Sequence, residues 1–126
     1  MTQEEKELLL VDLCARLPYM PKIKITYQQQ GIRGTDEGNV SCDFIEKIVN
    51  DLRNGVITDI QIYLRPMSSM TEEEKKEYFN LCEICVGYDG KYSQIKVFDW
   101  LNVHHFDYRD LIEKGLALEA PEEMYN

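Results

Sequence analysis

The sequence predicts a single α+β domain: a small antiparallel sheet from the middle of the chain, able to curl into a barrel, packed by N-terminal, central and C-terminal helices. Two observations favour this class. Apolar residues recur every three or four positions near both ends and after Thr71, whereas polar and apolar residues alternate over 22–27. The 126 residues, 44% of them hydrophobic, suffice for one buried core. We expect this domain to cover residues 1–118, followed by an acidic, frayed tail over 119–126.

The first helix is expected at the N-terminus. Thr2 and Glu5 have the spacing of a capping box, in which each side chain accepts a hydrogen bond from the other residue's backbone N–H. The apolar residues that follow form one stripe, made of Leu9, Leu10, Leu13, Cys14 and Leu17. Pro18 ends the helix, because proline lacks the N–H that a helix interior needs.

The middle of the chain is expected to supply the sheet. Alternation over 22–27 predicts a half-buried strand, and a second strand is expected over 56–64. Residues 28–39 are polar and contain three glycines, which indicates a loop or a wide hairpin. Residues 41–53 fit two structures. Their apolar spacing favours a helix, whereas an alternating start and a following Asn-Gly pair favour a strand. We prefer the helix.

Three further helices are expected in the second half. Thr71 and Glu74 form a second capping box, and the helix that they start has a predicted buried face of Tyr78, Leu81, Cys82 and Cys85. The next helix is expected over 93–104, with Ile95, Phe98 and Leu101 on its buried face and Trp100 beside them. Asp107 can cap a short last helix that ends near Gly115.

The charge of the chain restricts its partners. The formal net charge is −9, from 23 acidic and 14 basic residues. An acidic surface repels phosphates and anionic lipid, so nucleic acid and membranes are disfavoured partners. No apolar run approaches the roughly 20 residues that cross a bilayer, and the N-terminus lacks a signal-peptide pattern. We therefore expect a cytoplasmic protein whose four cysteines stay reduced.

Two long segments carry a resemblance: YLRPMSSMTEEE at 63–74 and DWLN..HFDYR.LIEKGLA at 99–117. In them the chain resembles a group of short, uncharacterised proteins from gut anaerobic bacteria and their phages. The resemblance also covers the first helix but not residues 22–59. It implies no activity. It implies a setting on phages or other mobile elements, where small accessory proteins often bind host components. It also implies a strand-rich segment before residue 63, which favours the strand alternative for 41–53.

Residues 99–109 hold the only tryptophan and both histidines of the chain. Trp100, Tyr108 and Arg109 are residue types enriched at binding hot spots, and Arg65 is a similar candidate. We predict these four as partner-binding residues. The alternative for the aromatic residues is core packing, and the alternative for the arginines is an internal ion pair or a joint between elements.

His104, His105 and Asp107 are the outside candidates for a metal site, because imidazole and carboxylate are common zinc ligands. Adjacent residues on a helix point about 100° apart, so the two imidazoles converge only if the helix ends between them. Otherwise one histidine caps the helix and the other packs beside an aromatic ring. Cys82 and Cys85 have redox spacing but lie deep in a helix, which predicts packed thiols. We predict no catalytic residue, metal or cofactor.

Three functional hypotheses remain. The leading one is a non-enzymatic protein-interaction module of phage or mobile-element origin, which binds a host or phage protein. The first alternative is a metal-assisted hydrolase that uses His104, His105 and Asp107. The second is an acidic inhibitor that mimics nucleic acid. An exposed Trp100 beside an apolar patch would favour the interaction module. Convergent metal ligands would favour the hydrolase, and carboxylates ranked along one face would favour the nucleic-acid mimic.

Overall fold

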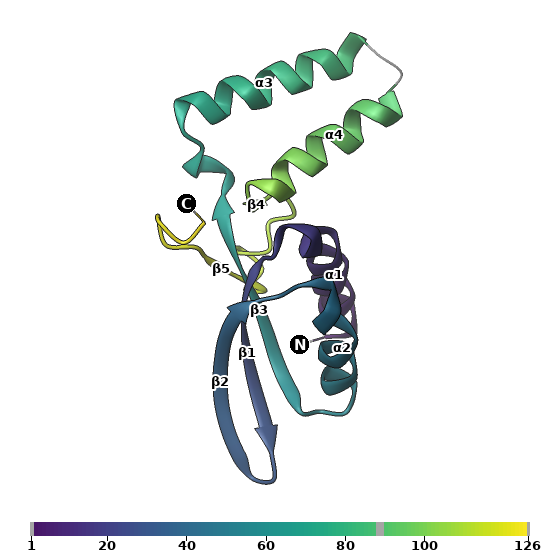
Figure 1. Ribbon diagram of the computed structural model, residues 1–126, viewed down its shortest axis with the longest axis vertical. Coiled ribbons are helices and arrows are strands. Elements are labelled where there is room, and N and C mark those ends of the chain that lie inside the picture. The colour runs from purple at the N-terminus through teal and green to yellow at the C-terminus, as the bar shows by residue number, and fades with distance from the viewer. Residues whose placement is uncertain (1, 88–89, 126) are drawn as a thin grey trace.

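The computed structural model describes the backbone of residues 2–87 and 90–125 and the side chains of residues 2–84 and 94–125. Within these residues the chain forms four α-helices and a five-stranded sheet (Figure 1). The helices are α1 (Gln3–Arg16), α2 (Ile45–Arg53), α3 (Glu72–Gly87) and α4 (Gly90–Val103). The strands are β1 (Lys22–Gln29), β2 (Ile32–Asn39), β3 (Ile57–Pro66), β4 (Phe106–Asp107) and β5 (Ala117–Glu119). Short 3-10 turns occupy Leu17–Tyr19, Cys42–Phe44 and Met67–Ser69. The predicted α+β class is confirmed.

The sheet is mixed and open. Its order is β2-β1-β3-β4, and β5 also pairs with β3. β1 is antiparallel to both β2 and β3, whereas β4 and β5 run parallel to β3. The antiparallel prediction therefore holds only for the first three strands, and the sheet does not close into a barrel.

The segment predicted as a loop or wide hairpin is a tight hairpin of β1 and β2. Its two-residue turn is Gln30-Gly31, with φ angles of 52° and 78°. Positive φ at both central positions matches the right-handed twist of the flanking strands, so the turn continues directly into paired strands. The register begins at Gln29↔Ile32 and ends at Lys22↔Asn39.

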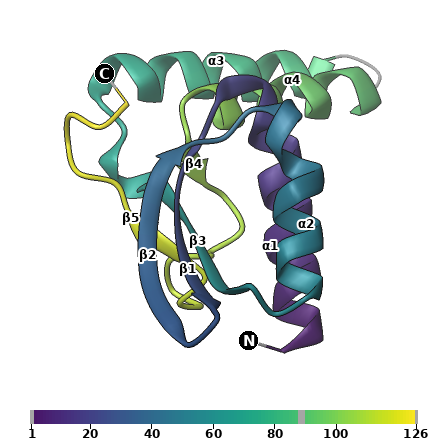
Figure 2. The same cartoon turned by 60° about the horizontal axis from the view of Figure 1, so that its bottom comes forward.

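The core lies between the sheet and two helices. Figures 1 and 2 show α1 and α2 together on one face of the sheet. β3 buries alternate residues against them, namely Ile60, Ile62 and Leu64. The region that fitted either a helix or a strand is the helix α2, which buries Ile48 and Leu52 one turn apart. The alternation at 40–44 precedes this helix and does not extend into it.

The other two helices do not cover the sheet, contrary to prediction. α3 and α4 leave the sheet as a pair and project from one end of the molecule (Figure 1); we call this pair the helical arm. The predicted capping box at its start is confirmed, since the Glu74 N–H donates to Thr71 Oγ1 and the Thr71 N–H donates to Glu74 Oε1. No helix in the described part of the chain has the length and apolar character to cross a membrane.

The predicted last helix is wrong. Asp107 does act as a cap, because its two carboxylate oxygens accept the N–H groups of Leu111 and Ile112. Asp110, however, has a φ of 57°, a left-handed conformation that an α-helix cannot contain, so the segment folds into turns instead. In the acidic tail, the Tyr125 hydroxyl donates to the Tyr63 carbonyl and accepts the Lys22 N–H.

Candidate protein-interaction site

The helical arm meets the sheet at a cluster of five side chains, the arm-root cluster: Arg65, Glu74, Trp100, His104 and Phe106. Arg65 is the penultimate residue of β3 and donates from both terminal nitrogens to the Glu74 carboxylate, at 2.7 and 2.8 Å. Its guanidinium also lies 4.2 Å from the centre of the ring of Phe106, which is buried. The paired guanidinium lowers the pKa of Glu74 to about 2. Arg65 therefore joins the start of α3 to the sheet.

Trp100 connects the two helices of the arm to the body. Its ring stacks on Phe106, with centroids 5.7 Å apart and an interplanar angle of 19°. It also contacts the rings of His104 and Tyr78 at 4.4 and 5.7 Å. Its indole N–H donates to Glu77 on α3 at 3.1 Å. Trp100 is half-buried, so its position lies between the two alternatives of core packing and full exposure.

A second cluster ties α1 to the chain after α4. We call it the buried charge cluster: Asp12, Arg16 and Arg109. Asp12 and Arg16 have no exposed surface and pair through two hydrogen bonds of 2.8 and 3.1 Å. Arg109 donates to the same Asp12 carboxylate at 2.7 Å, and Arg16 also donates to the Phe106 carbonyl at 2.7 Å. The sequence reasoning missed Asp12 and Arg16, although an acid and a base four residues apart beside an apolar stripe signal such a pair.

Tyr108 lies against this cluster. Its hydroxyl donates to Asn102 at 2.9 Å, and its ring contacts the guanidinium groups of Arg16 and Arg109. The four predicted partner-binding residues therefore fall into two groups, Arg65 with Trp100 and Tyr108 with Arg109, and both groups hold the arm onto the body. Their role in binding a partner stays a prediction.

The three candidate metal ligands have separate contacts. His104 Nδ1 lies 3.5 Å from Glu74, whereas the His105 ring stacks on Tyr125 at 3.6 Å. Burial lowers the pKa of His105 to about 4. Asp107 accepts two backbone N–H groups, as described above. Within the described residues, no group of three or more His, Cys, Asp or Glu side chains could hold a metal ion.

Of the predicted cysteine pair, Cys82 and Cys85, the structure describes one side chain. Cys82 is half-buried, and the side chain of Cys85 lies outside the described residues. Cys14, expected in the buried stripe of the first helix, is exposed. Val11, one turn earlier, is also exposed, so the outer side of α1 carries these two apolar residues after the exposed Glu7.

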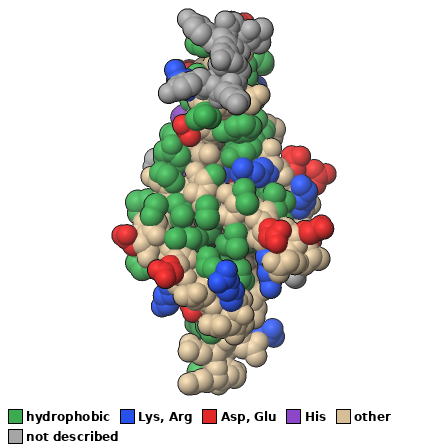
Figure 3. Space-filling model, turned by 90° about the vertical axis from the view of Figure 1, so that its right-hand side faces the viewer, with side chains coloured by type: hydrophobic (Ala, Val, Ile, Leu, Met, Phe, Trp, Pro, Cys, Tyr) green, Lys and Arg blue, Asp and Glu red, His purple; other side chains and the backbone are tan. Residues whose placement is uncertain are grey.

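The helical arm exposes apolar side chains on both of its helices. Among its described side chains, none from 72 to 84 or from 94 to 99 is buried. Phe79 is 63% exposed, and the other large apolar residues exposed here are Ile84, Ile95 and Phe98. Figure 3 shows hydrophobic side chains continuing from the arm over the helices of the body. The predicted buried face of α3 is corrected, since Tyr78, Leu81 and Cys82 are only half-buried. The predicted buried face of α4 is corrected too, since Ile95 and Phe98 are exposed whereas Leu101 is buried.

This apolar surface was missed because the sequence reasoning assigned one buried stripe to α3 and assumed that the sheet would cover it. Phe79 and Ile84 lie outside that stripe, and apolar residues on more than one face of a helix indicate a second surface to be covered.

A comparison of the chain with protein-family models, curated proteins and solved structures finds no match.

Proposed function

We propose that this protein is a non-enzymatic protein-interaction module and that the helical arm is its contact surface. The observation that carries this proposal is the lack of any buried side chain over 72–84 and 94–99. Helices in water gain most of their stability from packing an apolar face, and two helices alone provide little of it. Phe79 and Ile95 therefore gain a place in a core only when another protein covers the arm.

The charge of the arm favours a particular kind of partner. Four exposed glutamates on α3 outnumber its two exposed lysines, Lys75 and Lys76; the glutamates are Glu72, Glu73, Glu77 and Glu83. A partner that presents an apolar centre with a basic rim matches both the exposed rings and these carboxylates. A second copy of this chain does not, because each copy carries a formal charge of −9. The resemblance to proteins of gut bacteria and phages favours a host or phage protein as this partner.

The two clusters at the base of the arm support this function by fixing its direction. Arg65 and Trp100 connect both arm helices to the sheet through Phe106. A contact surface held in one orientation loses less conformational entropy on binding. These residues are therefore positioning residues for the arm.

A double variant tests the proposal. Phe79→Ser with Ile95→Ser removes two exposed apolar side chains without touching the core. Proteins retained from a lysate of the native cells are identified, and the retained partner is purified and titrated calorimetrically. We expect the double variant to bind it at least about thirtyfold more weakly, since each lost anchor costs upwards of about 1 kcal/mol.

The matched control is Ile32→Ser, because Ile32 is 66% exposed but lies at the far end of the β1–β2 hairpin. This variant should bind as tightly as the wild type. Equal affinity of the double variant and the wild type would contradict the proposal. So would a wild-type dimer in sedimentation that the double variant makes monomeric, since a second copy would then cover the arm.

A further inference from the structure

A groove with a cavity volume of about 390 Å³ lies between the β1–β2 hairpin and α2. Its lining includes Ile25 and Tyr27 from β1 and Phe44 and Ile48 from the segment of α2. It lies in the body, on a different surface from the helical arm. Phe44 is 57% exposed, so the groove presents apolar surface to the solvent. No contact described above uses this surface.

The groove exists because β2 lacks large side chains on its inner face. The register places Gly38 opposite Ile23 and Gly34 opposite Tyr27. A Cβ atom at residue 34 would come within 2.5 Å of the Tyr27 hydroxyl, so the ring of Tyr27 needs this glycine. At residue 38 a Cβ atom would meet nothing within 4 Å. The space beside Gly38 is therefore open groove.

β2 is also a free edge of the sheet. Among the described strands it pairs only with β1. In an antiparallel pair, every second residue turns its N–H and C=O groups away from the neighbouring strand. The register begins with the hydrogen-bonded pair Gln29–Ile32, so the residues of β2 that point away from β1 are Arg33, Thr35 and Glu37. One of them already has a substitute partner, because the Glu37 N–H donates to Asp36 Oδ1 at 2.9 Å. An extended peptide could replace this contact and pair along the whole edge.

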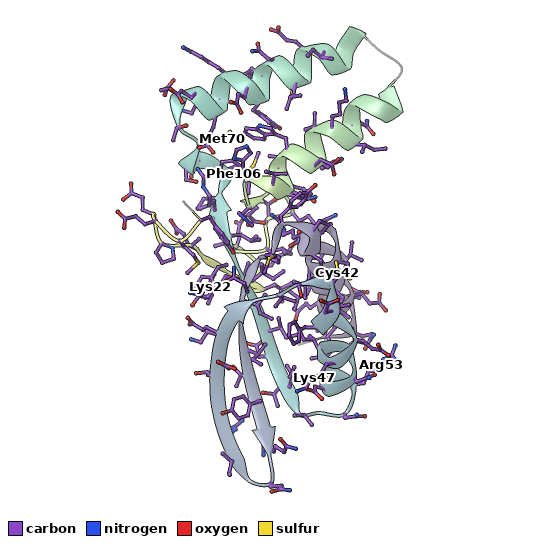
Figure 4. All side chains as sticks on the ribbon, viewed as in Figure 1. Lys22, Cys42, Lys47, Arg53, Met70 and Phe106 are labelled. Atoms are coloured by element: carbon purple, nitrogen blue, oxygen red, sulfur yellow. The ribbon has the colours of Figure 1, made fainter. Side chains whose placement is uncertain are left out.

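The charges beside the groove are mostly acidic. Asp36 and Asp51 line it together with Lys47, the side chain labelled beside α2 in Figure 4, whereas Glu37 borders it with its carboxylate on the other face of the sheet. Glu37 accepts a hydrogen bond from the Tyr63 hydroxyl on the outer face of the sheet, and this contact raises the pKa of Tyr63. Asp51 has no ion-pair partner among the described residues. A ligand with apolar residues and a basic side chain fits this combination.

We propose that this groove binds an extended peptide, which adds a strand to the edge of β2, seats alternate apolar side chains beside Gly38 and places a basic side chain near Asp36 and Asp51. Main-chain hydrogen bonds to the edge supply affinity, and the groove selects side chains at every second position. The protein then has two binding surfaces, one on the helical arm and one in the body.

A phage-displayed library of random decapeptides is the probe. We expect selection on the full chain to enrich peptides in which apolar residues alternate and one position is basic. In NMR spectra of the complex, the amide signals of Arg33, Thr35 and Glu37 should shift and exchange more slowly with deuterium. Failure to enrich any peptide, or shifts confined to the helical arm, would overturn the proposal.

Gly38→Leu adds a side chain to the groove, since a Cβ atom there meets nothing within 4 Å and Gly38 does not adopt the left-handed conformation. It should weaken peptide binding at least about tenfold. Thr26→Leu is the matched control, because Thr26 lies on the opposite face of the sheet in β1, away from the free edge, and it should leave the affinity unchanged. Equal binding by Gly38→Leu would exclude the groove. A dimer of the free protein that Gly38→Leu disrupts would assign the edge to a second copy and also overturn the proposal.

Asp36→Asn tests the charge separately, because asparagine keeps an oxygen that can accept the Glu37 N–H. Selected peptides with a basic residue should bind this variant up to about fivefold more weakly, as expected for an exposed ion pair. An unchanged affinity would remove the basic side chain from the proposed ligand.

Discussion

The body and the helical arm bury their apolar residues in different ways. In the body, Leu9 and Leu13 of α1 and Ile60, Ile62 and Leu64 of β3 have no exposed surface. In the arm, no described side chain over 72–84 is buried, although this segment contains a tyrosine, a phenylalanine, a leucine and an isoleucine. The body is therefore stabilised by its own core, whereas the described side chains of the arm form no buried core beyond its root. Stability and partner binding should respond to different substitutions.

The largest effect is expected in the buried charge cluster. Asp12→Ala removes the acceptor of both Arg16 and Arg109 and leaves the Arg16 charge buried. The free energy of unfolding should fall by about 3–5 kcal/mol, measured by urea denaturation. Glu7→Ala on the exposed side of the same helix should change it by less than about 0.5 kcal/mol. Similar values for the two variants would mean that the cluster does not hold the body together.

The same substitution made once in each region tests the comparison directly. Leu64→Ala in the body should cost about 2–5 kcal/mol, because a fully buried side chain leaves a cavity. Leu81→Ala in the half-buried arm should cost about 1 kcal/mol or less. Denaturation by urea compares the two. Equal losses would show that the arm has a core of its own.

A pH titration should separate the contribution of His105. Its pKa in the folded chain is about 4, below the ordinary value of 6.5, so the unfolded chain binds the proton first. The stability that depends on neutral His105 is complete above pH 6.5 and falls as the pH drops from 6.5 towards 4. His105→Asn should reduce this slope, since asparagine does not titrate and tolerates the φ of 61°. An unchanged slope would mean that other titrating groups cause the loss of stability in this pH range.

Glu74 should give a smaller effect at lower pH, and this effect should concern the arm. Its pKa is lowered from 4.5 to about 2 by Arg65, so the pair stabilises the protein above pH 4.5 and weakens as the pH falls towards 2. Glu74→Gln should speed hydrogen exchange in α3 at pH 6 and leave exchange in β3 unchanged. The difference between the exchange rates of α3 in the variant and in the wild type should become smaller as the pH falls from 4.5 to 3. Faster exchange throughout the body would contradict the separation of the two regions.

Local signals in the sequence predicted much of the fold. The capping boxes at Thr2 and Thr71 are in place because both partners of each box lie within one turn. The tight β1–β2 hairpin was missed because glycine and charged residues disfavour strands, and here pairing with β1 overrides that preference. The short strand β5 depends on a parallel neighbour that local sequence does not reveal.

For the candidate site too, the residues themselves were predicted but their distant partners were not. Trp100, Tyr108, Arg109 and Arg65 were found as chemically informative residues, and the structure brings them to the base of the arm. Arg109 pairs with Asp12 and Arg65 pairs with Glu74. The first of these pairs joins residues 97 positions apart, which no spacing rule predicts. The exposure of Phe79 was signalled only in part: an apolar residue outside the predicted stripe of α3 indicates a second apolar face, but the sequence does not reveal that the sheet leaves this face uncovered.

The parallel pairing of β3 with β4 has a consequence for how this architecture can change. Arg65 lies beside Phe106, and the Arg65 N–H donates to the His105 carbonyl at 2.8 Å. The chain thus departs from the body and returns to it at the same place. Residues 70–103 form an insertion whose two ends are already neighbours, so a segment of different length or specificity could be grafted there while the scaffold keeps its own core. Under the proposed function, the body is then the platform and the helical arm is the part that recognises the partner.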